Sequence, residues 1–273
     1  MPLLRLATNL ATACHPQPTV AVTTLSTVLL AGAGNPAGTC LLGALAVLTG
    51  QLSIGWSNDL IDRGRDVAAG RLDKPMAAGE LAASELRTAC AIAVLLTVPL
   101  SLALGWLPGL VHLVAVAAGW AYNVRLKFTL LSPLPYLVAF GALPVIATTA
   151  LPEPHLPPWQ VVLAAMLIGL AAHFANVLPD LAADLATGVR GLPQAAGFAR
   201  SAAVAGAAAL AATVLLLVQE PGLVTALGLV AVCAVLVVVG WAARARRAGV
   251  VFTAIIGCAA IGVALIVATG GLG

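Results

Sequence analysis

Long runs of apolar residues, separated by short polar connections, constrain this chain more than any other feature of its sequence. A helix needs roughly 20 mostly apolar residues to cross the hydrocarbon core of a bilayer. Nine runs approach that length, at residues 19–34, 39–56, 87–106, 109–123, 133–151, 159–177, 200–218, 223–242 and 250–270. With 61% apolar and only 8% charged residues, the chain has more apolar surface than a water-soluble core can bury. The sequence therefore predicts an all-α, polytopic membrane protein, with nine transmembrane helices bundled around a central cavity.

The basic residues alternate from one connection to the next. All 13 lie in the N-terminal segment or around the connections after the second, fourth, sixth and eighth runs, namely Arg5, Arg63, Arg65, Arg71, Lys74, Arg87, Arg125, Lys127, Arg190, Arg200, Arg244, Arg246 and Arg247. Cytoplasmic loops are those enriched in Lys and Arg. The pattern predicts a protein of the cell membrane with a cytoplasmic N-terminus and an external C-terminus. Since Pro16 and Pro18 separate Arg5 from the first run, we expect a retained span there rather than a cleaved signal.

A polar pattern occurs twice, once after the second run and once after the sixth. Both copies have the form N-x-x-x-D-x-x-x-D, formed by Asn58, Asp62 and Asp66 and, 118 residues later, by Asn176, Asp180 and Asp184. A glycine stands four residues after the last aspartate of each copy (Gly70 and Gly188), and an arginine follows (Arg71 and Arg190). We therefore expect residues 1–273 to form one membrane-embedded domain with two similar halves, marked by the motifs at 58–71 and 176–190.

A spacing of four residues places side chains on one face of a helix, one turn apart. We expect each motif to continue its transmembrane helix as a polar ridge beyond the membrane. Like charges at this spacing repel, and Mg²⁺ compensates them well because it binds a few carboxylates together with substrate phosphates. The candidate metal ligands are Asn58, Asp59, Asp62, Asp66, Asn176, Asp180 and Asp184, and the candidate catalytic residues among them are Asp62, Asp66, Asp180 and Asp184.

Basic residues flank the two predicted ridges, as a site for a diphosphate held through Mg²⁺ requires. The candidates for diphosphate binding are Arg71, Lys74, Arg125, Lys127 and Arg190. A single motif of this kind is equally consistent with a solvated helix extension that bears scattered charges. Two copies in register, at the level of the membrane surface, favour a functional site, because acidic residues are costly there.

These motifs resemble those of the UbiA superfamily of intramembrane prenyltransferases. The NDxxDxxxD motif of that family is matched by Asn58, Asp59, Asp62 and Asp66, and its basic-Pro element by Asp73-Lys74-Pro75. Its second motif, DxxxD with a following Gly-x-Lys/Arg element, is matched by Asp180, Asp184, Gly188 and Arg190. The YxxxK element is approximated by Tyr122 and Lys127, with one residue more than usual. The resemblance extends over nearly the whole chain.

The resemblance implies Mg²⁺-dependent transfer of a prenyl group from an allylic polyprenyl diphosphate to a hydrophobic or amphipathic acceptor. Three further residues are possible contacts of the acceptor or of the allylic cation: Tyr122, His173 and Trp56. An aromatic ring can stabilise a cation through its face, although such a residue near a helix end is more often an interface anchor. For His173 the alternative is a hydrogen-bonded core histidine.

Two other functions remain compatible with the sequence. A UbiA-type terpene cyclase would use the same diphosphate site and quench the cation within the same molecule. A secondary transporter would also have two similar halves, but its ionisable residues are expected near the bilayer midplane rather than at helix ends. The small net charge of +3 gives no reason to expect a nucleic-acid partner. The sequence leaves the acceptor, the prenyl length and the oligomeric state open.

Overall fold

The computed structural model describes residues 2–273, and within that range its regular elements are all helices. They are α1 (Pro2–Ala13), α2 (Pro16–Gly32), α3 (Ala37–Ala68), α4 (Ala83–Ala103), α5 (Trp106–Val124), the 3₁₀ turn η1 (Leu126–Phe128), α6 (Leu134–Thr149), α7 (Trp159–Val177), α8 (Leu181–Ala186), α9 (Leu192–Ala196), α10 (Phe198–Gln219), α11 (Leu223–Arg244) and α12 (Ala248–Thr269). The predicted all-α class is confirmed.

Each of the nine predicted apolar runs corresponds to one helix, although four of the runs extend a few residues beyond its ends. Seven of these helices, α3, α4, α5, α7, α10, α11 and α12, are long and apolar enough to cross a membrane. The other two runs form α2 and α6, which have 17 and 16 residues and are shorter than a usual span. The chain is thus an integral, multi-pass membrane protein with seven clear candidate spans among the described residues.

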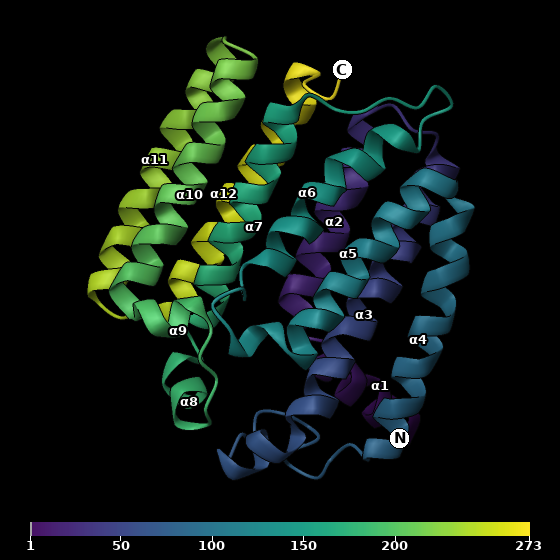
Figure 1. Ribbon diagram of the computed structural model, residues 1–273, viewed down its shortest axis with the longest axis vertical. Coiled ribbons are helices and arrows are strands. Elements are labelled where there is room, and N and C mark those ends of the chain that lie inside the picture. The colour runs from purple at the N-terminus through teal and green to yellow at the C-terminus, as the bar shows by residue number, and fades with distance from the viewer. Residues whose placement is uncertain (1) are drawn as a thin grey trace.

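Six helices surround the interior. Neighbouring pairs in contact are α2 with α3, α3 with α5, α5 with α6, α6 with α7, α7 with α12 and α12 with α2, which closes a ring. Outside this ring, α4 packs on α3 and α5, while α10 and α11 pack beside α7 and α12 (Figure 1). Helices α2 and α6 also contact each other across the ring. This arrangement leaves a cavity inside the six helices.

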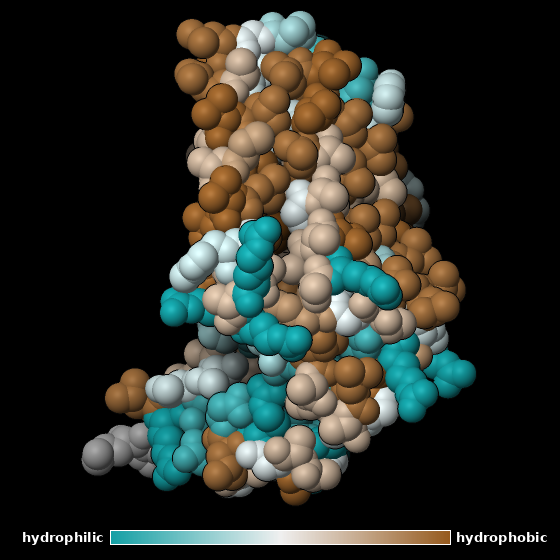
Figure 2. Space-filling model, turned by 90° about the vertical axis from the view of Figure 1, so that its left-hand side faces the viewer, coloured by the Kyte–Doolittle hydropathy of each residue, from teal (hydrophilic) through white to brown (hydrophobic). Residues whose placement is uncertain are grey.

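The outer surface is apolar along most of the long axis and polar at one end. Figure 2 shows apolar side chains over the upper part of one face, with polar side chains gathered toward its lower end. On the outer helices, Leu95 of α4 and Val237 of α11 are each 73% exposed. Such large, continuous apolar surface is what lipid-facing helices present.

The first polar motif forms the helical ridge that its spacing predicts, but the second does not. Helix α3 continues without a break to Ala68, so it includes both Asp62 and Asp66. The predicted continuation of the sixth span through Asp184 is wrong, because α7 ends at Val177. Pro179 has no backbone N–H and clashes with a continuing helix. The chain resumes in the separate six-residue helix α8, which has Asp180 at its N-cap.

The matched glycines end both motif helices in the same way. Gly70 and Gly188 adopt the left-handed conformation, with φ values of 66° and 84°. The residue after each glycine donates its N–H to the carbonyl of the last motif aspartate: Arg71 to Asp66 at 3.0 Å, and the residue after Gly188 to Asp184 at 2.9 Å. This is the Schellman arrangement, in which glycine avoids the strain of positive φ. The sequence repeat is therefore also a repeat of backbone structure.

Candidate functional site

The two motif segments meet at the polar end of the molecule. The chain leaves α3 and turns through residues 69–82, near α8 at the lower end in Figure 1. In this loop Arg71 donates hydrogen bonds to Asp180 at 2.9 Å and to Asp73 at 2.8 and 2.9 Å. These bonds raise the pKa of the Arg71 guanidinium above its usual value, Asp73 having the largest effect. One arginine thus links the first motif region directly to the second.

Asp62 lies at the centre of the first ridge, between two cationic side chains. The Lys127 ammonium donates to both Asp62 oxygens, at 2.6 and 2.7 Å, and Arg65 also pairs with this carboxylate. Lys127 belongs to η1, the 3₁₀ turn that follows α5. Lys127 thus reaches Asp62 although one residue more than usual separates it from Tyr122. Burial lowers the pKa of the Lys127 ammonium, although Asp62 opposes the shift.

Lys74 joins the two remaining carboxylates of α3. Its ammonium lies 3.0 Å from Asp59 Oδ1 and 2.9 Å from Asp66 Oδ2. Burial alone would lower the pKa of Lys74, but the two carboxylates outweigh it and raise the pKa above its usual value. His15, at the junction of α1 and α2, lies 3.2 Å from the same Asp59 oxygen. All three aspartates of α3 therefore have a basic partner.

Asp184 differs from the other motif aspartates in having a neutral partner. The Gln194 amide donates to it at 2.8 Å, and no Lys or Arg of residues 2–273 forms an ion pair with it. Burial raises the pKa of the Asp184 carboxyl, and the nearby Asp180 and Asp62 add to this shift. Asp184 is thus the motif carboxylate that would gain most from an added cation.

The two motif asparagines are anchored alike. Asn58 donates its amide N–H to Asn123 Oδ1, and Asn176 donates to Tyr136 Oη, each at 3.2 Å. In both cases the amide oxygen accepts no hydrogen bond from residues 2–273. Both asparagines line the central cavity. Each therefore presents an unused oxygen, the ligand type that Mg²⁺ prefers, at the boundary between the charged site and the cavity.

Aromatic side chains form the wall next to this boundary. Tyr122 of α5 packs edge-on against Tyr136 of α6 and His173 of α7, with ring centroids 5.5 and 5.7 Å apart. Both tyrosines line the cavity. His173 is fully buried, its Nε2 lies 3.0 Å from Ser132 Oγ, and its Nδ1 has no partner among residues 2–273. The structure thus brings two of the three predicted aromatic contacts, Tyr122 and His173, beside the motifs.

Three predicted site residues form no hydrogen bond or ion pair with the side chains of the two motifs. Trp56 donates its indole N–H to Leu10 O at 2.9 Å and packs with the core between α1 and α3, so it does not line the cavity. Arg125 and Arg190 are exposed, and neither forms an ion pair with any described residue. Their predicted role in diphosphate binding rests on the sequence alone.

The structure adds site residues that sequence reasoning missed. Arg65 follows Asp62 by three residues, a helical spacing that could have identified it. Asn123 is adjacent to Tyr122, and besides accepting from Asn58 it donates to Ser57 Oγ at 2.9 Å. Gln194 has no comparable sequence signal, because α9 brings it back to Asp184 only through tertiary packing.

Most of the motif carboxylates pair with basic side chains and do not gather into a cage of their own. Within residues 2–273, no three His, Cys, Asp or Glu side chains cluster closely enough to hold a metal ion. Mg²⁺ does not require such a cage, since it binds through one or two carboxylates and completes its octahedron with water and substrate phosphate. The arrangement suits an ion that arrives together with a phosphorylated ligand.

An apolar cavity opens from this charged end into the helix ring. Its volume is about 230 Å³, and α2, α3, α5, α6, α7 and α12 all contribute to its wall. Asn58, Tyr122 and Asn176 line it next to the motifs, while residues such as Leu25, Phe140 and Ile255 line it farther inside. The site can thus hold an anionic group at the polar end and an apolar group within the bundle.

Comparison with a protein-family model identifies a match to the UbiA prenyltransferase family over residues 20–254. This range includes both polar motifs, the whole of α3, α5, α6 and α7, most of α2 and only the first seven residues of α12. Comparison of the sequence with curated proteins gives no match.

Three solved structures share the fold over nearly the whole chain. A UbiA homolog from Archaeoglobus fulgidus bound to GPP and Mg²⁺ has a TM-score of 0.70 and 15% identity, covering 94% of this chain and 99% of that one. A UbiA homolog from Aeropyrum pernix K1 has a TM-score of 0.69 and 18% identity, covering 92% and 98%. A digeranylgeranylglyceryl phosphate synthase has a TM-score of 0.66 and 14% identity, covering 98% of each chain.

Proposed function

The chain belongs to the UbiA prenyltransferase family, and we propose that it transfers a prenyl group from an allylic polyprenyl diphosphate to a hydrophobic or amphipathic acceptor, with Mg²⁺ as cofactor. Two of the similar structures are described as bound to GPP or DMAPP together with Mg²⁺. The observation that supports the proposal most is the Arg71–Asp180 contact, which joins the two motifs at the open end of an apolar cavity.

The oxygen ligands of both motifs would hold Mg²⁺. Asn58, Asp59, Asp62 and Asp66 contribute from α3, and Asn176, Asp180 and Asp184 from the second motif. The fit rests on the unused amide oxygens of the asparagines and on Asp184, which has no cationic partner among the described residues. Bound there, Mg²⁺ neutralises negative charge that develops on the leaving diphosphate.

The basic residues of the site would bind the diphosphate directly. Lys74, Lys127 and Arg71 each donate to motif carboxylates. A phosphate oxygen is an equivalent anionic acceptor, so each cation can exchange one partner for the other without moving far. These side chains therefore neutralise the carboxylates in the free protein and contact the phosphate in the complex. Arg125 and Arg190 are proposed as outer contacts of the same anion.

The cavity wall would then protect and orient the allylic cation. Tyr122 and Tyr136 line the cavity beside the asparagines, and an aromatic face attracts a cation within about 6 Å of its centroid. The surrounding apolar helices exclude water, which would otherwise hydrolyse the cation. His173 packs against both tyrosine rings and helps to fix their orientation. Trp56 remains a proposed contact on sequence grounds alone.

We place the site at the cytoplasmic face of the cell membrane, because the basic connections lie at the same end as the motifs. We also propose that residues 1–273 form a single domain that crosses the membrane nine times. The short helices α2 and α6 are part of the ring, where they contact each other as well as their neighbours on either side.

A direct assay tests the proposed activity. Membranes containing the chain are incubated with radiolabelled geranyl or geranylgeranyl diphosphate, with Mg²⁺ or with EDTA, alongside membranes that lack the chain. We expect diphosphate release and a prenylated lipid-soluble product that require both the chain and Mg²⁺. A cyclic hydrocarbon or cyclic alcohol formed without any acceptor would show that the chain is a cyclase instead.

A further inference from the structure

Two polar side chains lie in the cavity far from the charged motifs. Gln51 of α3 and His112 of α5 both line it, and His112 is only 4% exposed. Gln51 precedes Asn58 by seven residues, and His112 precedes Tyr122 by ten. At 1.5 Å per residue these separations place the pair about 10–15 Å deeper in the bundle than the motif end of the cavity. The mechanism above gives neither residue a role.

The hydrogen bonds of His112 determine which of its ring nitrogens is available. Its Nδ1 lies 2.7 Å from Ser101 Oγ, and the Ser101 hydroxyl donates its single hydrogen to Thr97 O at 2.5 Å. Ser101 must therefore accept from His112, so that Nδ1 bears the proton. No described carboxylate pairs with the buried His112, so a positive charge on its ring would be uncompensated, and we infer that the ring is neutral. Its Nε2 is then a lone-pair acceptor.

This acceptor faces the helix that bears Gln51. A Cβ atom added at Gly50 would lie 3.3 Å from His112 Nε2, which places the nitrogen against α3 at the residue next to Gln51. Neither Nε2 nor the Gln51 amide forms a hydrogen bond with residues 2–273. Polar groups so deep in an apolar interior are costly unless a ligand satisfies them. Together the pair offers a hydrogen-bond acceptor and an amide that can donate.

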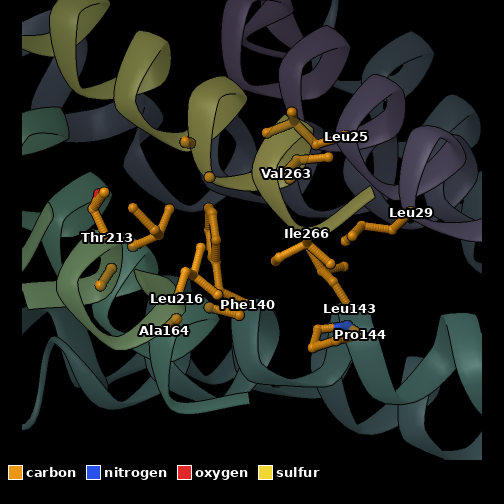
Figure 3. Close-up of a pocket in the computed structure, with 15 residues that line it drawn as sticks. Leu25, Leu29, Phe140, Leu143, Pro144, Ala164, Thr213, Leu216, Val263 and Ile266 are labelled. Carbon is orange, nitrogen blue, oxygen red and sulfur yellow. The ribbon is translucent and has the colours of Figure 1, made fainter. Parts of the chain in front are cut away.

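The isoprenoid tail of the proposed substrate fits better on another, apolar side of the cavity. Leu25, Phe140, Leu143 and Ala259 line the central cavity and also a second, smaller hollow. Figure 3 shows this hollow, whose wall is apolar except for Thr213. That threonine already donates to Ala209 O. Gln51 and His112, which belong to α3 and α5, do not line this hollow.

We propose that Gln51 and His112 bind a neutral hydroxyl group of the acceptor, while the prenyl tail occupies the apolar side of the cavity. A hydroxyl can donate to His112 Nε2 and accept from the Gln51 amide at the same time. No Lys or Arg of residues 2–273 lines the cavity, so a carboxylate or phosphate there would be uncompensated. This inference rests on the proposed prenyl transfer and narrows its acceptor to a neutral, hydroxyl-bearing amphiphile.

Binding of three matched probes tests the inference. Biphenyl-4-ol, 4-methoxybiphenyl and biphenyl-4-carboxylate are titrated into the purified full-length protein, together with Mg²⁺ and pyrophosphate. The wild type is expected to prefer the alcohol over the ether by about tenfold or more, because an ether cannot donate to Nε2. His112→Leu and Gln51→Leu should remove this preference. Ser101→Ala should weaken it, because His112 Nδ1–H loses its acceptor and the ring can adopt the other tautomer. Thr225→Val, a buried change in α11 outside the helix ring, should leave it unchanged.

Each outcome decides one claim. The inference is overturned if the wild type does not distinguish the alcohol from the ether, as expected of a pair that holds only water. It is also overturned if the leucine variants keep the preference, or if the carboxylate binds as tightly as the alcohol. Mg²⁺-dependent pyrophosphate binding, measured in the same samples, shows that the variants are folded. If the wild type lacks that binding, the proposed function fails while the hydroxyl preference is still judged independently.

Discussion

Asp62→Asn is expected to reduce Mg²⁺-dependent consumption of prenyl diphosphate by more than about 1,000-fold, since several kcal/mol of charge stabilisation are at stake. The carboxylate accepts two bonds from Lys127 and pairs with Arg65. An asparagine of nearly the same size removes the negative charge. It thereby removes the proposed metal ligand and leaves two partly buried cations without their partner.

Loss of a buried ion-pair partner also affects folding, by about 3–5 kcal/mol, so the amount of folded protein must be measured together with the rate. Arg63→Gln provides the matched control, because Arg63 is adjacent in α3, is exposed and forms no ion pair with a described residue. It should keep nearly full activity. Full activity of folded Asp62→Asn would exclude Asp62 from the site.

Asp184→Asn is expected to reduce the same activity by about 100-fold or more, although this residue lies in the other half of the chain. The asparagine oxygen can still accept the hydrogen bond from Gln194, so the backbone of α8 should be unaffected. Because no described Lys or Arg pairs with Asp184, the substitution leaves no cation stranded. We therefore expect thermal unfolding in detergent to change little while the rate falls.

Glu80→Gln is the corresponding control for Asp184→Asn. Glu80 is an exposed acid in the loop after α3, and its side chain forms no ion pair with residues 2–273. Unchanged activity of Glu80→Gln beside a strong loss in Asp184→Asn would show that position, rather than net charge, matters. Equal activities of the two variants would contradict the role of the second motif.

Local patterns in the sequence were sufficient for the first half of the site. The spacing of Asn58, Asp62 and Asp66 predicts that they share one face of a helix. The structure has an uninterrupted helix, α3, over all three residues. The same spacing failed for the second motif, because Pro179 ends α7 before Asp180. The motif pattern alone did not reveal this, although the proline itself was a sufficient signal.

Contacts between distant parts of the chain could not be predicted from the sequence. Arg71 bonds to a carboxylate 109 residues away, and the similar spacing of Arg190 did not place it in the same network. As an aromatic residue near the motif, Trp56 was a plausible cavity residue. It faces α1 instead, where its indole N–H donates to the Leu10 carbonyl. Side-chain direction depends on tertiary packing that one sequence does not specify.

The central claim is that the two motifs form one Mg²⁺–diphosphate site, and binding of inorganic pyrophosphate tests it most directly. Isothermal titration of the purified protein, with Mg²⁺ or with EDTA, gives both affinity and stoichiometry. We predict one pyrophosphate per chain, bound only with Mg²⁺, and lost in Asp62→Asn as well as in Asp184→Asn. Binding that persists in EDTA, or that remains intact when either motif is altered, would contradict a single shared site.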